Sequence, residues 1–555
     1  MTSNSTPKFV ILAVLDGWGI AADGPGNAIS IAKTINMKKF TNSYPHTQLD
    51  ASGEAVGLPR AEDGNTETGH LNLGAGRIVY QELQRINVAI AEGTFFENKV
   101  LMGAVEHAKQ NNSNLHLMGL LGAGGVHSNI EHLYALVQLS KRMDFKKVFI
   151  HVFTDGRDSP PTAAKTYLDQ LGNVLDKENV GKIATIMGRY WAMDRDQRWD
   201  RTEKAYKALT QGKGNLVKTA EEAIELSYEE GKTDEFIDPS VIVDKDGEPI
   251  AKISDNDAVV FFNFRIDRPR QLTKAFVFSD FSKAPISFDF DPYEVKYKKT
   301  HLTKREFKAE VPFDRGPVLK NLYFATMTEY GKPISDEGAK PAFPPEVIPM
   351  PLSGAVSTAG LRQLKITESE KERFVTIYLN GLREKPYPLE ERVIIPSPKV
   401  PTYDQKPLMS ASLITETLLA KLSTMDYKLA VVNYPNVDMV GHTGNIGAAV
   451  KAIEAVDENV GKLANFALAY EGILLITADH GNAEEMINLA TGEIDTEHST
   501  NRVPFIAVSH KFTGRGQTLR TGILADVAPT ILSLLNVPIP STMTGRNLLS
   551  DLELF

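Results

Sequence analysis

Three short apolar runs in the outer parts of the chain, each followed by polar residues, predict strands that are buried on both faces. The runs cover residues 9–15, 428–433 and 472–478. Between the second and third runs, apolar residues recur at three- and four-residue steps over residues 450–466, which predicts an amphipathic helix. Strand, helix and strand form the βαβ unit of an open α/β sheet, whose ligands bind beyond the carboxyl ends of the strands. The polar residues expected at this edge are Asp16, Asp438, Asp479 and His480.

The middle of the chain differs, because arginines recur between residues 151 and 270. Residues 258–264 predict a further strand, with Arg265 and Arg268 just beyond its end. Residues 212–257 are acidic and have helical periodicity, with a turn expected at Asp246 and Gly247. Residues 281–320 are mixed, charged and interrupted by proline, as expected of a linker. The pattern favours an α/β fold in which one domain is inserted into another.

Composition excludes several classes of function. The 555 residues include no cysteine, which excludes disulfides, zinc–thiolate sites, iron–sulfur clusters and a catalytic thiol. The formal net charge of −9 argues against a nucleic-acid surface. The apolar run near the N-terminus is too short for a secretory signal, and no run of about 18 apolar residues follows. We therefore expect a soluble cytoplasmic protein that does not bind membranes.

The outer segments carry carboxylates and imidazoles at spacings that suit metal binding. Asp438 and His442 are four residues apart, on one face if the turn is helical. Asp479 and His480 follow a buried strand, where Gly481 permits the chain to turn. With Asp16 and His498, these donors are sufficient for two metals, and oxygen plus imidazole suits Mn or Zn. Alternatively, Asp438 caps a helix and His442 is a solvent-exposed side chain.

A candidate nucleophile lies at Thr66. Gly64 and Asn65 are expected to form a tight turn, with Thr66 at the start of a helix whose free N–H groups favour a phosphate. The hydroxyl either caps the helix or is activated by a metal as an attacking alkoxide. The motif alone does not decide between these two roles.

Arginines after the predicted strands form the third group of candidates. Forked guanidinium groups bind phosphate and carboxylate, although for any single arginine a surface salt bridge is the simpler interpretation. Their density in an acidic chain favours a positive pocket for a small polyanion. The candidates are Arg157, Arg189, Arg195, Arg265 and Arg268.

A series of motifs in this order resembles one family over nearly the whole chain. They are LDGWG (15–19), GHLNLGAGR (69–77), GVHS (125–128), GRDSPP (156–161), the segment 190–201, FNFR (262–265), PSPKV (396–400) and DMVGHTG (438–444). Together they resemble the cofactor-independent (2,3-bisphosphoglycerate-independent) phosphoglycerate mutases of the alkaline phosphatase superfamily. The resemblance implies interconversion of 3-phosphoglycerate and 2-phosphoglycerate through a phospho-enzyme, without 2,3-bisphosphoglycerate. It also implies a monomer with two divalent ions, most commonly Mn, with Co, Zn or Mg as alternatives.

The resemblance also implies a role for individual residues. One metal would be held by Asp438, His442 and His498, and the other by Asp16, Asp479, His480 and the hydroxyl of Thr66. Substrate would be held by His127, Arg157, Asp158, Arg189, Arg195, Arg265, Arg268 and Lys371. Thr66, Lys371 and Asp158 would be catalytic. A phosphatase-like metal domain, residues 1–82 and 316–555, would be interrupted by a substrate-binding phosphotransferase domain, residues 83–315.

Two positions depart from the family pattern. Thr66 stands where the family normally has serine, and its methyl group restricts the side chain. Asn129 replaces a histidine that often follows the GVHS segment, and only a minor change is expected there. Two other interpretations remain: a phosphohydrolase or phosphopentomutase of the same superfamily, and a catalytically impaired binding protein.

Overall fold

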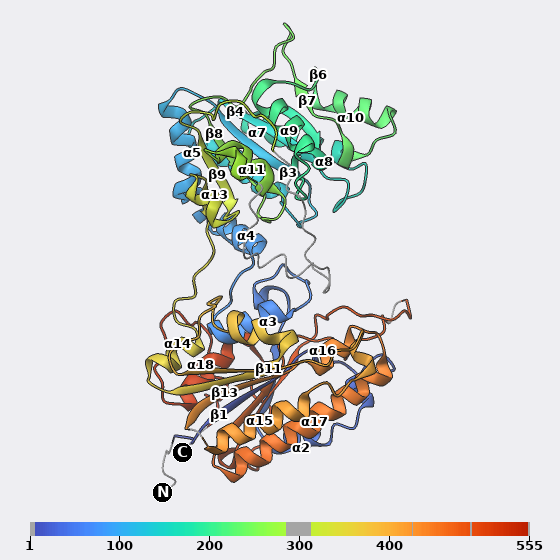
Figure 1. The fold of residues 1–555 in the computed structure, drawn as a ribbon, viewed down its shortest axis with the longest axis vertical. Helices are drawn as coiled ribbons and strands as arrows, with labels where there is room; N and C mark the ends of the chain where they lie inside the picture. Colours follow the sequence, from blue (N-terminus) through green and yellow to red (C-terminus); the bar gives the residue numbers. More distant parts are fainter. Residues whose placement is uncertain (1–5, 285–311, 425, 489–490, 553–555) are drawn as a thin grey trace. The chain divides into compact units, whose positions relative to one another are not determined.

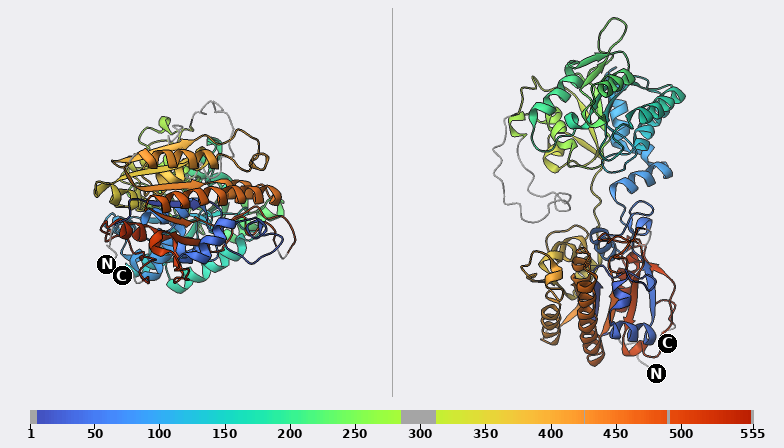
Figure 2. Two further views of the ribbon diagram at one scale, coloured as in Figure 1. Left: turned by 90° about the horizontal axis from the view of Figure 1, so that it is seen from below. Right: turned by 90° about the vertical axis from the view of Figure 1, so that its right-hand side faces the viewer.

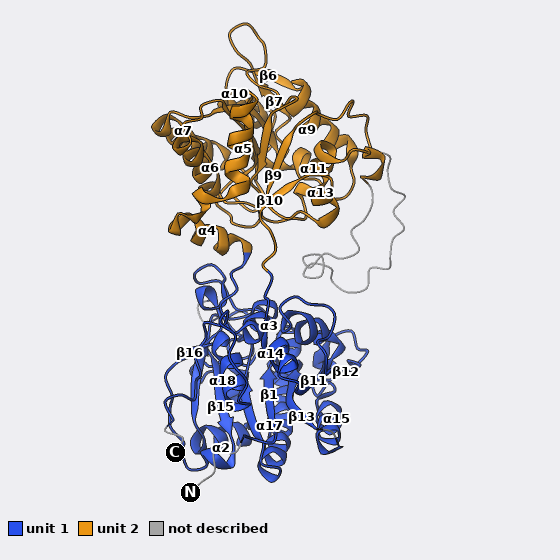
Figure 3. Cartoon of the chain, turned by 90° about the vertical axis from the view of Figure 1, so that its left-hand side faces the viewer, with its two compact units in different colours: residues 1–81, 347–555 blue, residues 82–346 orange. Residues whose placement is uncertain are grey.

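The computed structural model describes residues 6–284, 312–424, 426–488 and 491–552, and it divides into two compact units. Unit 1 comprises residues 1–81 and 347–555, and unit 2 comprises residues 82–346 (Figure 3). The chain therefore enters and leaves unit 2 once, as the predicted insertion requires. Of the predicted linker over 281–320, residues 285–311 lie outside the described residues.

Unit 1 is built on an eight-stranded sheet in the order β12-β11-β13-β1-β14-β15-β2-β16. Only β15 runs antiparallel to its neighbours, and the other pairs are parallel. The strands are β1 Val10–Leu15, β2 His46–Asp50, β11 Arg362–Glu368, β12 Glu390–Ile395, β13 Tyr427–Tyr434, β14 Ile473–Thr477, β15 Val503–Val508 and β16 Gly522–Ile523. The three strands predicted from apolar runs are β1, β13 and β14, and they lie side by side in the sheet.

Helices cover both faces of this sheet (Figures 1 and 2). Helices α2, α15 and α17 pack together on one face, and α14 and α18 lie on the other. The helices are α1 Ala28–Ile31, α2 Ile35–Ser43, α3 Thr66–Ala75, α14 Leu352–Thr358, α15 Ala411–Thr424, α16 Asn436–Gly441, α17 Ile446–Ala469 and α18 Val527–Leu534. Helix α17 contains the predicted amphipathic segment, and its apolar residues Ile453, Val456 and Val460 are fully buried. Because both faces are covered, the central strands β1, β13 and β14 are predominantly apolar.

Unit 2 contains a second eight-stranded sheet, in the order β10-β9-β8-β3-β4-β5-β7-β6. Its strands are parallel except that β7 pairs antiparallel with β5. The strands are β3 Leu115–Leu121, β4 Val148–Thr154, β5 Lys182–Gly188, β6 Asn215–Val217, β7 Ser240–Ile242, β8 Ala258–Phe261, β9 Tyr323–Thr328 and β10 Lys340–Phe343. The helices are α4 Glu82–Glu92, α5 Lys99–Gln110, α6 Ile130–Arg142, α7 Ala164–Glu178, α8 Arg189–Ala192, α9 Trp199–Gln211, α10 Ala220–Glu229, α11 Pro269–Val277 and α13 Lys332–Asp336.

Strand β8 shows how alternation builds two cores in unit 2. Ala258 and Val260 face one apolar cluster, which includes helices α5, α6 and α7, whereas Val259 and Phe261 face another, which includes α9 and α11. Successive side chains of a strand point to opposite faces, so one short run contributes to both cores. Both clusters are made of unit 2 residues alone.

Two sequence expectations about unit 2 are corrected by the structure. The return to unit 1 was expected at residue 316, but it follows Glu346, because β9 pairs with β8 and β10 pairs with β9. Residues 212–257 form one helix, α10, but they also contain the short strands β6 and β7. The expected turn is present, since Gly247 has a φ of +82° and its N–H donates to Asp244 O.

None of the helices in the described ranges has both the length and the apolar character needed to cross a membrane.

Candidate active site

Four adjacent parallel strands of unit 1 end at one edge of the sheet, and polar side chains follow each of them. In the order β11-β13-β1-β14, the chain continues into Lys371, Asp438, Asp16 and the pair Asp479–His480. Asp16 and helix α16 are joined directly, because the N–H of Asp438 donates to Asp16 O at 3.0 Å. The structure therefore brings together the residues that the strand pattern placed at this edge.

Thr66 is the first residue of α3, and its hydroxyl faces this cluster. Oγ1 lies 2.9 Å from Lys371 Nζ, 2.8 Å from His480 Nε2 and 3.4 Å from Asp16 Oδ1. The helix is capped by Asn65, whose side chain accepts from Thr68 N. The interpretation of Thr66 as the cap is therefore wrong. So is the predicted tight turn, because Asn65 has an extended backbone, with φ −151° and ψ 161°.

Lys371 is buried at the centre of the cluster. Its Nζ donates to Asp16 Oδ1 at 2.7 Å and to Asp438 Oδ2 at 2.8 Å, in addition to Thr66. Burial alone disfavours the ammonium form, but Asp16 and Asp438 outweigh it and raise the pKa of Lys371 above its ordinary value. The side chain is therefore a fixed positive charge beside the Thr66 hydroxyl.

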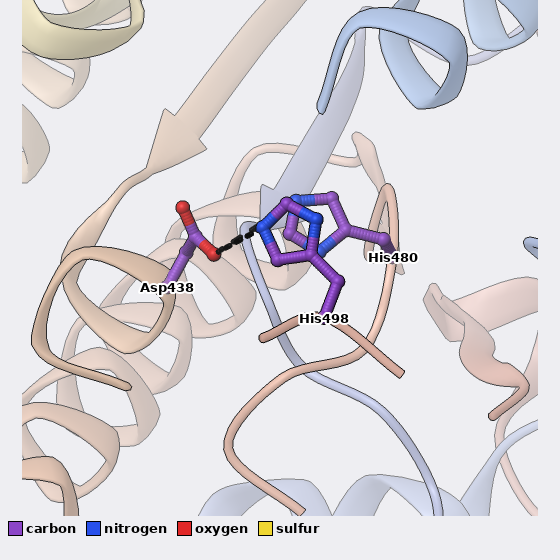
Figure 4. Close-up of side chains that lie close together, drawn as sticks. All are labelled: Asp438, His480 and His498. Carbon is purple, nitrogen blue, oxygen red and sulfur yellow. Dashed lines mark ion pairs between the residues drawn. The ribbon is translucent and has the colours of Figure 1, made fainter. Parts of the chain in front are cut away.

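Three imidazoles surround Asp438 at the outer side of the cluster. Oδ1 of Asp438 lies 3.3 Å from Nε2 of both His442 and His498, which are 3.1 Å from each other. The rings of His480 and His498 stack with their centroids 3.9 Å apart, and both point toward Asp438 in Figure 4. Asp438 raises the pKa of His442, whereas burial and His480 lower the pKa of His498. Burial opposes charging of His480, but Asp479 and Asp16 raise its pKa to about 10.

Asp479 lies deeper and is fully buried. Neither of its carboxylate oxygens has a hydrogen-bond partner, although His70 Nδ1 lies 3.1 Å from Oδ2. Its charge partners are the imidazoles of His70 and His480, which lie 3.1 and 3.6 Å from Oδ2. The donor atoms of Asp16, His70 and Asp479 lie close enough together to hold a cation.

The sequence analysis assigned no role to His70 or Asn433, which connect Asp16 with Asp479. Asn433 Nδ2 donates to Asp16 Oδ2 at 2.8 Å and lies 3.2 Å from His70 Nε2. With Nε2 as acceptor, the His70 proton is on Nδ1, which faces Asp479 and Thr66 O. The sequence did contain a signal for each of these two residues. His70 lies one helical turn after Thr66, and Asn433 lies near the end of a buried strand.

The donor set fits two divalent ions. The buried carboxylates Asp16, Asp438 and Asp479 lie among the imidazoles of His442, His480 and His498, a mixed oxygen and nitrogen donor set. Two groups of three side chains have their donor atoms within 4.8 Å of one another: Asp438, His480 and His498, and Asp16, His70 and Asp479. Oxygen and imidazole nitrogen without sulfur suit Mn and Zn. His480 lies between the groups, with Nε2 3.4 Å from Asp16 and 4.0 Å from Asp438.

Unit 2 carries a separate cluster, at the carboxyl ends of β3, β4, β5 and β8. Each of these strands is followed by predicted substrate residues: His127, Arg157 with Asp158, Arg189, and Arg265 with Arg268. Residues 122 and 124–128 line a small recess together with Asp155 and Asp158. As in unit 1, neighbouring parallel strands gather residues from distant parts of the sequence.

Arg189 organises the buried part of this second cluster. Its Nη1 donates to Asp155 Oδ1 at 2.6 Å and to Asp158 Oδ2 at 2.5 Å. His127 Nε2 lies 3.6 Å from Asp158 Oδ2, and burial, more than any neighbouring charge, lowers the pKa of His127 to about 2. The His127 imidazole is therefore neutral across the physiological range.

The arginines create a positive field here. Burial, together with Arg189 and Arg195, lowers the pKa of Arg268 to about 10, which shows how closely these cations are gathered. The side chains of Arg157 and Arg195 are 54% and 44% exposed and extend into solvent. Arg157 pairs only loosely with Glu235, at 3.8 Å. An anion that neutralises these cations has both buried and exposed partners.

Asp267, which the sequence analysis did not assign, connects three of the predicted residues. Oδ2 accepts from Arg195 at 2.7 Å, and Oδ1 lies 3.3 Å from Arg265 Nε and 3.5 Å from His127 Nδ1. Its position between Arg265 and Arg268 in the sequence was the available signal. The unusual Asn129 caps α6 by accepting from Glu131 N.

Comparisons with known proteins agree with this arrangement. The family model described as "BPG-independent PGAM N-terminus" matches residues 86–332, which lie within unit 2. A protein of Moorella thermoacetica named 2,3-bisphosphoglycerate-independent phosphoglycerate mutase is 48% identical over 540 residues, which are 97% of this chain and 98% of that relative. A protein of Chloroflexus aurantiacus with the same name is 48% identical over 547 residues, or 98% of this chain and 99% of that relative.

A solved structure is also similar over the whole length. The phosphoglycerate mutase of Leishmania mexicana, determined at low cobalt concentration, has 29% identity and a TM-score of 0.55, and the match covers 98% of both chains.

Proposed function

The chain belongs to the family of 2,3-bisphosphoglycerate-independent phosphoglycerate mutases, and on this premise we propose how its residues carry out the reaction. It is an enzyme that interconverts 3-phosphoglycerate and 2-phosphoglycerate without 2,3-bisphosphoglycerate. The relatives give no support to the alternatives of a phosphohydrolase, a phosphopentomutase or an impaired binding protein.

We propose that two divalent ions bind in unit 1. Asp438, His442 and His498 hold one ion, and Asp16, Asp479, His480 and Thr66 Oγ1 hold the other. The orphaned carboxylate of Asp479 and the short distances around Asp438 support this assignment. When bound, such ions lower the pKa of a ligated hydroxyl and neutralise charge on phosphoryl oxygens.

Thr66 is the proposed nucleophile. Its Oγ1, as the alkoxide, attacks phosphorus, the bond from phosphorus to the glycerate oxygen breaks, and a phospho-threonine forms; the same alkoxide is regenerated when Oγ1 is released. Lys371, 2.9 Å from Oγ1, neutralises charge on the phosphoryl group as it passes. In the second half of the reaction the other glycerate oxygen attacks phosphorus, and Oγ1 is released. The added methyl group of threonine does not prevent the hydroxyl from facing Lys371 and His480.

Asp158 is the proposed proton carrier between the two glycerate oxygens. It takes the proton from the hydroxyl that attacks next and returns it to the oxygen that has just lost the phosphoryl group, so that no net proton is consumed. Its contact with Arg189 at 2.5 Å favours the carboxylate form that this role needs.

The remaining residues of the unit 2 cluster hold the glycerate between the two transfers. Arg189, Arg265 and Arg268 supply charge-assisted hydrogen bonds to its carboxylate and hydroxyls, with Arg157 and Arg195 at the solvent side and neutral His127 beside them. Retaining the glycerate favours return of the phosphoryl group to it over transfer to water.

The convergence of Thr66 Oγ1, Lys371 and His480 is the observation on which this proposal rests. The test uses metal-stripped protein to which Mn, Co, Zn or Mg is restored separately, with 2-phosphoglycerate followed by coupling to enolase. With ³²P-labelled 3-phosphoglycerate, an acid quench should trap label on Thr66.

Thr66→Ala should lose the label and the mutase activity, and Thr66→Ser should keep both. Thr68→Ala is a matched control on the same helix, because the Thr68 hydroxyl bonds only to Asn65. Label on the Thr66→Ala protein, or free phosphate released as fast as substrate is lost, would contradict the proposal.

The finer properties are also proposals. Mixed oxygen and imidazole donors suit both Mn and Zn, and we propose Mn because it is the ion most common in the family. A monomer is consistent with a fold in which each unit has its own core. The proposed site of action is the cytoplasm.

A further inference from the structure

Glu484 is a buried carboxylate that the reaction does not use, and it lies five residues after Asp479. Its side chain accepts four hydrogen bonds. Oε2 accepts from Gly19 N at 3.0 Å and from Asn482 N at 2.9 Å. Oε1 accepts from Asn501 Nδ2 at 3.1 Å and from the Ser499 hydroxyl. Among the described residues, Glu484 forms no ion pair with a lysine, arginine or histidine.

The four donors come from the two loops that carry Asp16, His480 and His498. Gly19 follows Asp16 by three residues in the loop after β1. Asn482, Ser499 and Asn501 lie with Glu484 in the connection between β14 and β15, Asn482 two residues after His480 and Ser499 next to His498. One carboxylate therefore joins the loop of Asp16 to the two segments of the β14–β15 connection that carry His480 and His498.

At two glycine positions, any larger side chain would collide with this carboxylate. A Cβ atom at Gly19 would lie 2.2 Å from Glu484 Oε1, and one at Gly481 would lie 2.3 Å from the same atom. Neither glycine has a positive φ in the structure, so neither is needed for its backbone conformation. Both positions instead leave room for the Glu484 side chain, and this is independent of the hydrogen bonds.

We propose that Glu484 is a positioning residue that fixes the loop of Asp16 against the segments that carry His480 and His498, and thereby sets the affinity of the centre for its metal ions. The inference rests on the proposed function, since it needs the ligands assigned there. Groups that orient the ligands of a metal change its affinity by about 10- to 100-fold when they are removed. Glu484 acts on the segments of three ligands together, whereas His70 and Asn433 connect Asp16 with Asp479.

The test measures binding of Mn²⁺ to metal-stripped protein by calorimetry, with the number of ions per chain. Glu484→Gln keeps the volume but turns one acceptor into a donor that faces N–H or O–H donors. Gly19→Ala places a methyl group against the carboxylate from another loop.

Both variants should raise the Mn²⁺ dissociation constant and the Mn²⁺ concentration for half-maximal activity by about 10- to 100-fold. At saturating Mn²⁺ the KM for 3-phosphoglycerate should be unchanged. The double variant should be little worse than either single one.

Two controls separate positioning from general loss of stability. Glu390→Gln changes a glutamate of unit 1 whose side chain is likewise buried, and which accepts from Asn380, Tyr387 N and Arg392 and pairs with Lys365 at 3.7 Å. It should lower the thermal stability of the metal-free protein without changing Mn²⁺ affinity. Gly24→Ala, in the same loop as Gly19 but in open space, should change neither.

Unchanged Mn²⁺ affinity in Glu484→Gln or Gly19→Ala overturns the inference while leaving the metal centre intact. Equal weakening by Glu390→Gln also overturns it. If the wild-type protein binds no Mn²⁺, the proposed centre itself is wrong and the inference falls with it.

Discussion

The two polar clusters differ in how far their charges are removed from water. In unit 1, Asp16, Asp438, Asp479 and Lys371 are all buried, Lys371 contacts both Asp16 and Asp438, and Asp479 pairs with His70 and His480. In unit 2, only Arg189 among the predicted arginines is fully buried, and Arg157 and Arg195 are about half exposed. Both clusters occupy the same place in their sheets, at the carboxyl ends of adjacent parallel strands.

This difference corresponds to two tasks. Buried charges at fixed distances suit small ions that stay bound, because the cage must be held together by its own contacts. Exposed guanidinium groups suit a ligand that enters and leaves in each cycle, since they remain hydrated when it is absent. The comparison predicts that substitutions in unit 1 alter metal content, whereas those in unit 2 alter substrate affinity.

The largest effect is expected from removing a ligand in unit 1. His442→Ala and Asp479→Ala should each lower activity by at least about 10³-fold, because a lost ion takes several kcal/mol of charge stabilisation with it. Metal analysis should show about one ion fewer per chain in each variant. Near-normal activity with both ions retained would contradict the assignment of metal binding to unit 1, on which the comparison rests.

A smaller effect is expected in unit 2. Arg189→Lys should raise KM for 3-phosphoglycerate by about 10- to 100-fold, because the lysine cannot hold Asp155 and Asp158 together as the guanidinium does. The exposed Arg157→Lys should raise KM by less than about fivefold. Metal content should stay at the wild-type value in both, as measured beside the kinetics. Loss of a metal in Arg189→Lys would show that the clusters are not independent.

The two clusters should also respond differently to pH. In the metal-free protein, Asp438 raises the pKa of His442 and neighbouring carboxylates raise that of His480 to about 10, so both hold protons that a metal must displace. Mn²⁺ affinity should therefore increase as pH rises from 6 to 8, by up to about tenfold per pH unit for each proton released. His127, with a pKa of about 2, should give KM no titration in this range. Equal Mn²⁺ affinity at pH 6 and pH 8 would contradict this expectation.

The smallest effects should come from the two asparagine caps. Asn65→Ala and Asn129→Ala each remove a side chain that caps a helix, α3 or α6, and each should lower the free energy of unfolding by about 1 kcal/mol. Denaturant titration measures this loss. Because α3 begins with Thr66, Asn65→Ala should lower kcat by a few-fold, while Asn129→Ala should instead raise KM. The same change in both variants would mean that the caps serve stability alone.

Local pattern was sufficient for the central strands. The runs at 9–15, 428–433 and 472–478 became β1, β13 and β14, because a strand covered on both faces needs an unbroken apolar sequence. The short strands β6 and β7 were missed, since three residues carry no periodicity against the helical pattern around them. The return to unit 1 was placed too early because β9 belongs to its sheet by pairing, which no local signal shows.

The residues of the candidate site also fall into those that local sequence pattern predicts and those that it does not. Residues that follow a buried strand, such as Asp16, were found from their position. His498 was found as a further imidazole close to them in the sequence, and the resemblance supplied Lys371. Residues that act through a partner distant in the sequence were not found by the sequence analysis. Glu484 contacts Gly19 across 465 positions, and His70 is informative only once Asn433 and Asp479 lie beside it. The roles proposed for these residues remain predictions until the substitutions are made.

Unit 2 is one continuous piece of chain, and its two ends are neighbours, since Arg85 near its start donates to Pro344 O near its end at 2.7 Å. Such a module can be cut out as a single gene fragment without cutting through either of its apolar clusters. An evolutionary origin as a cassette acquired by an older metalloenzyme needs only one insertion event. The same property makes residues 82–346 a practical unit for recombination between relatives, with the arginine cluster exchanged whole.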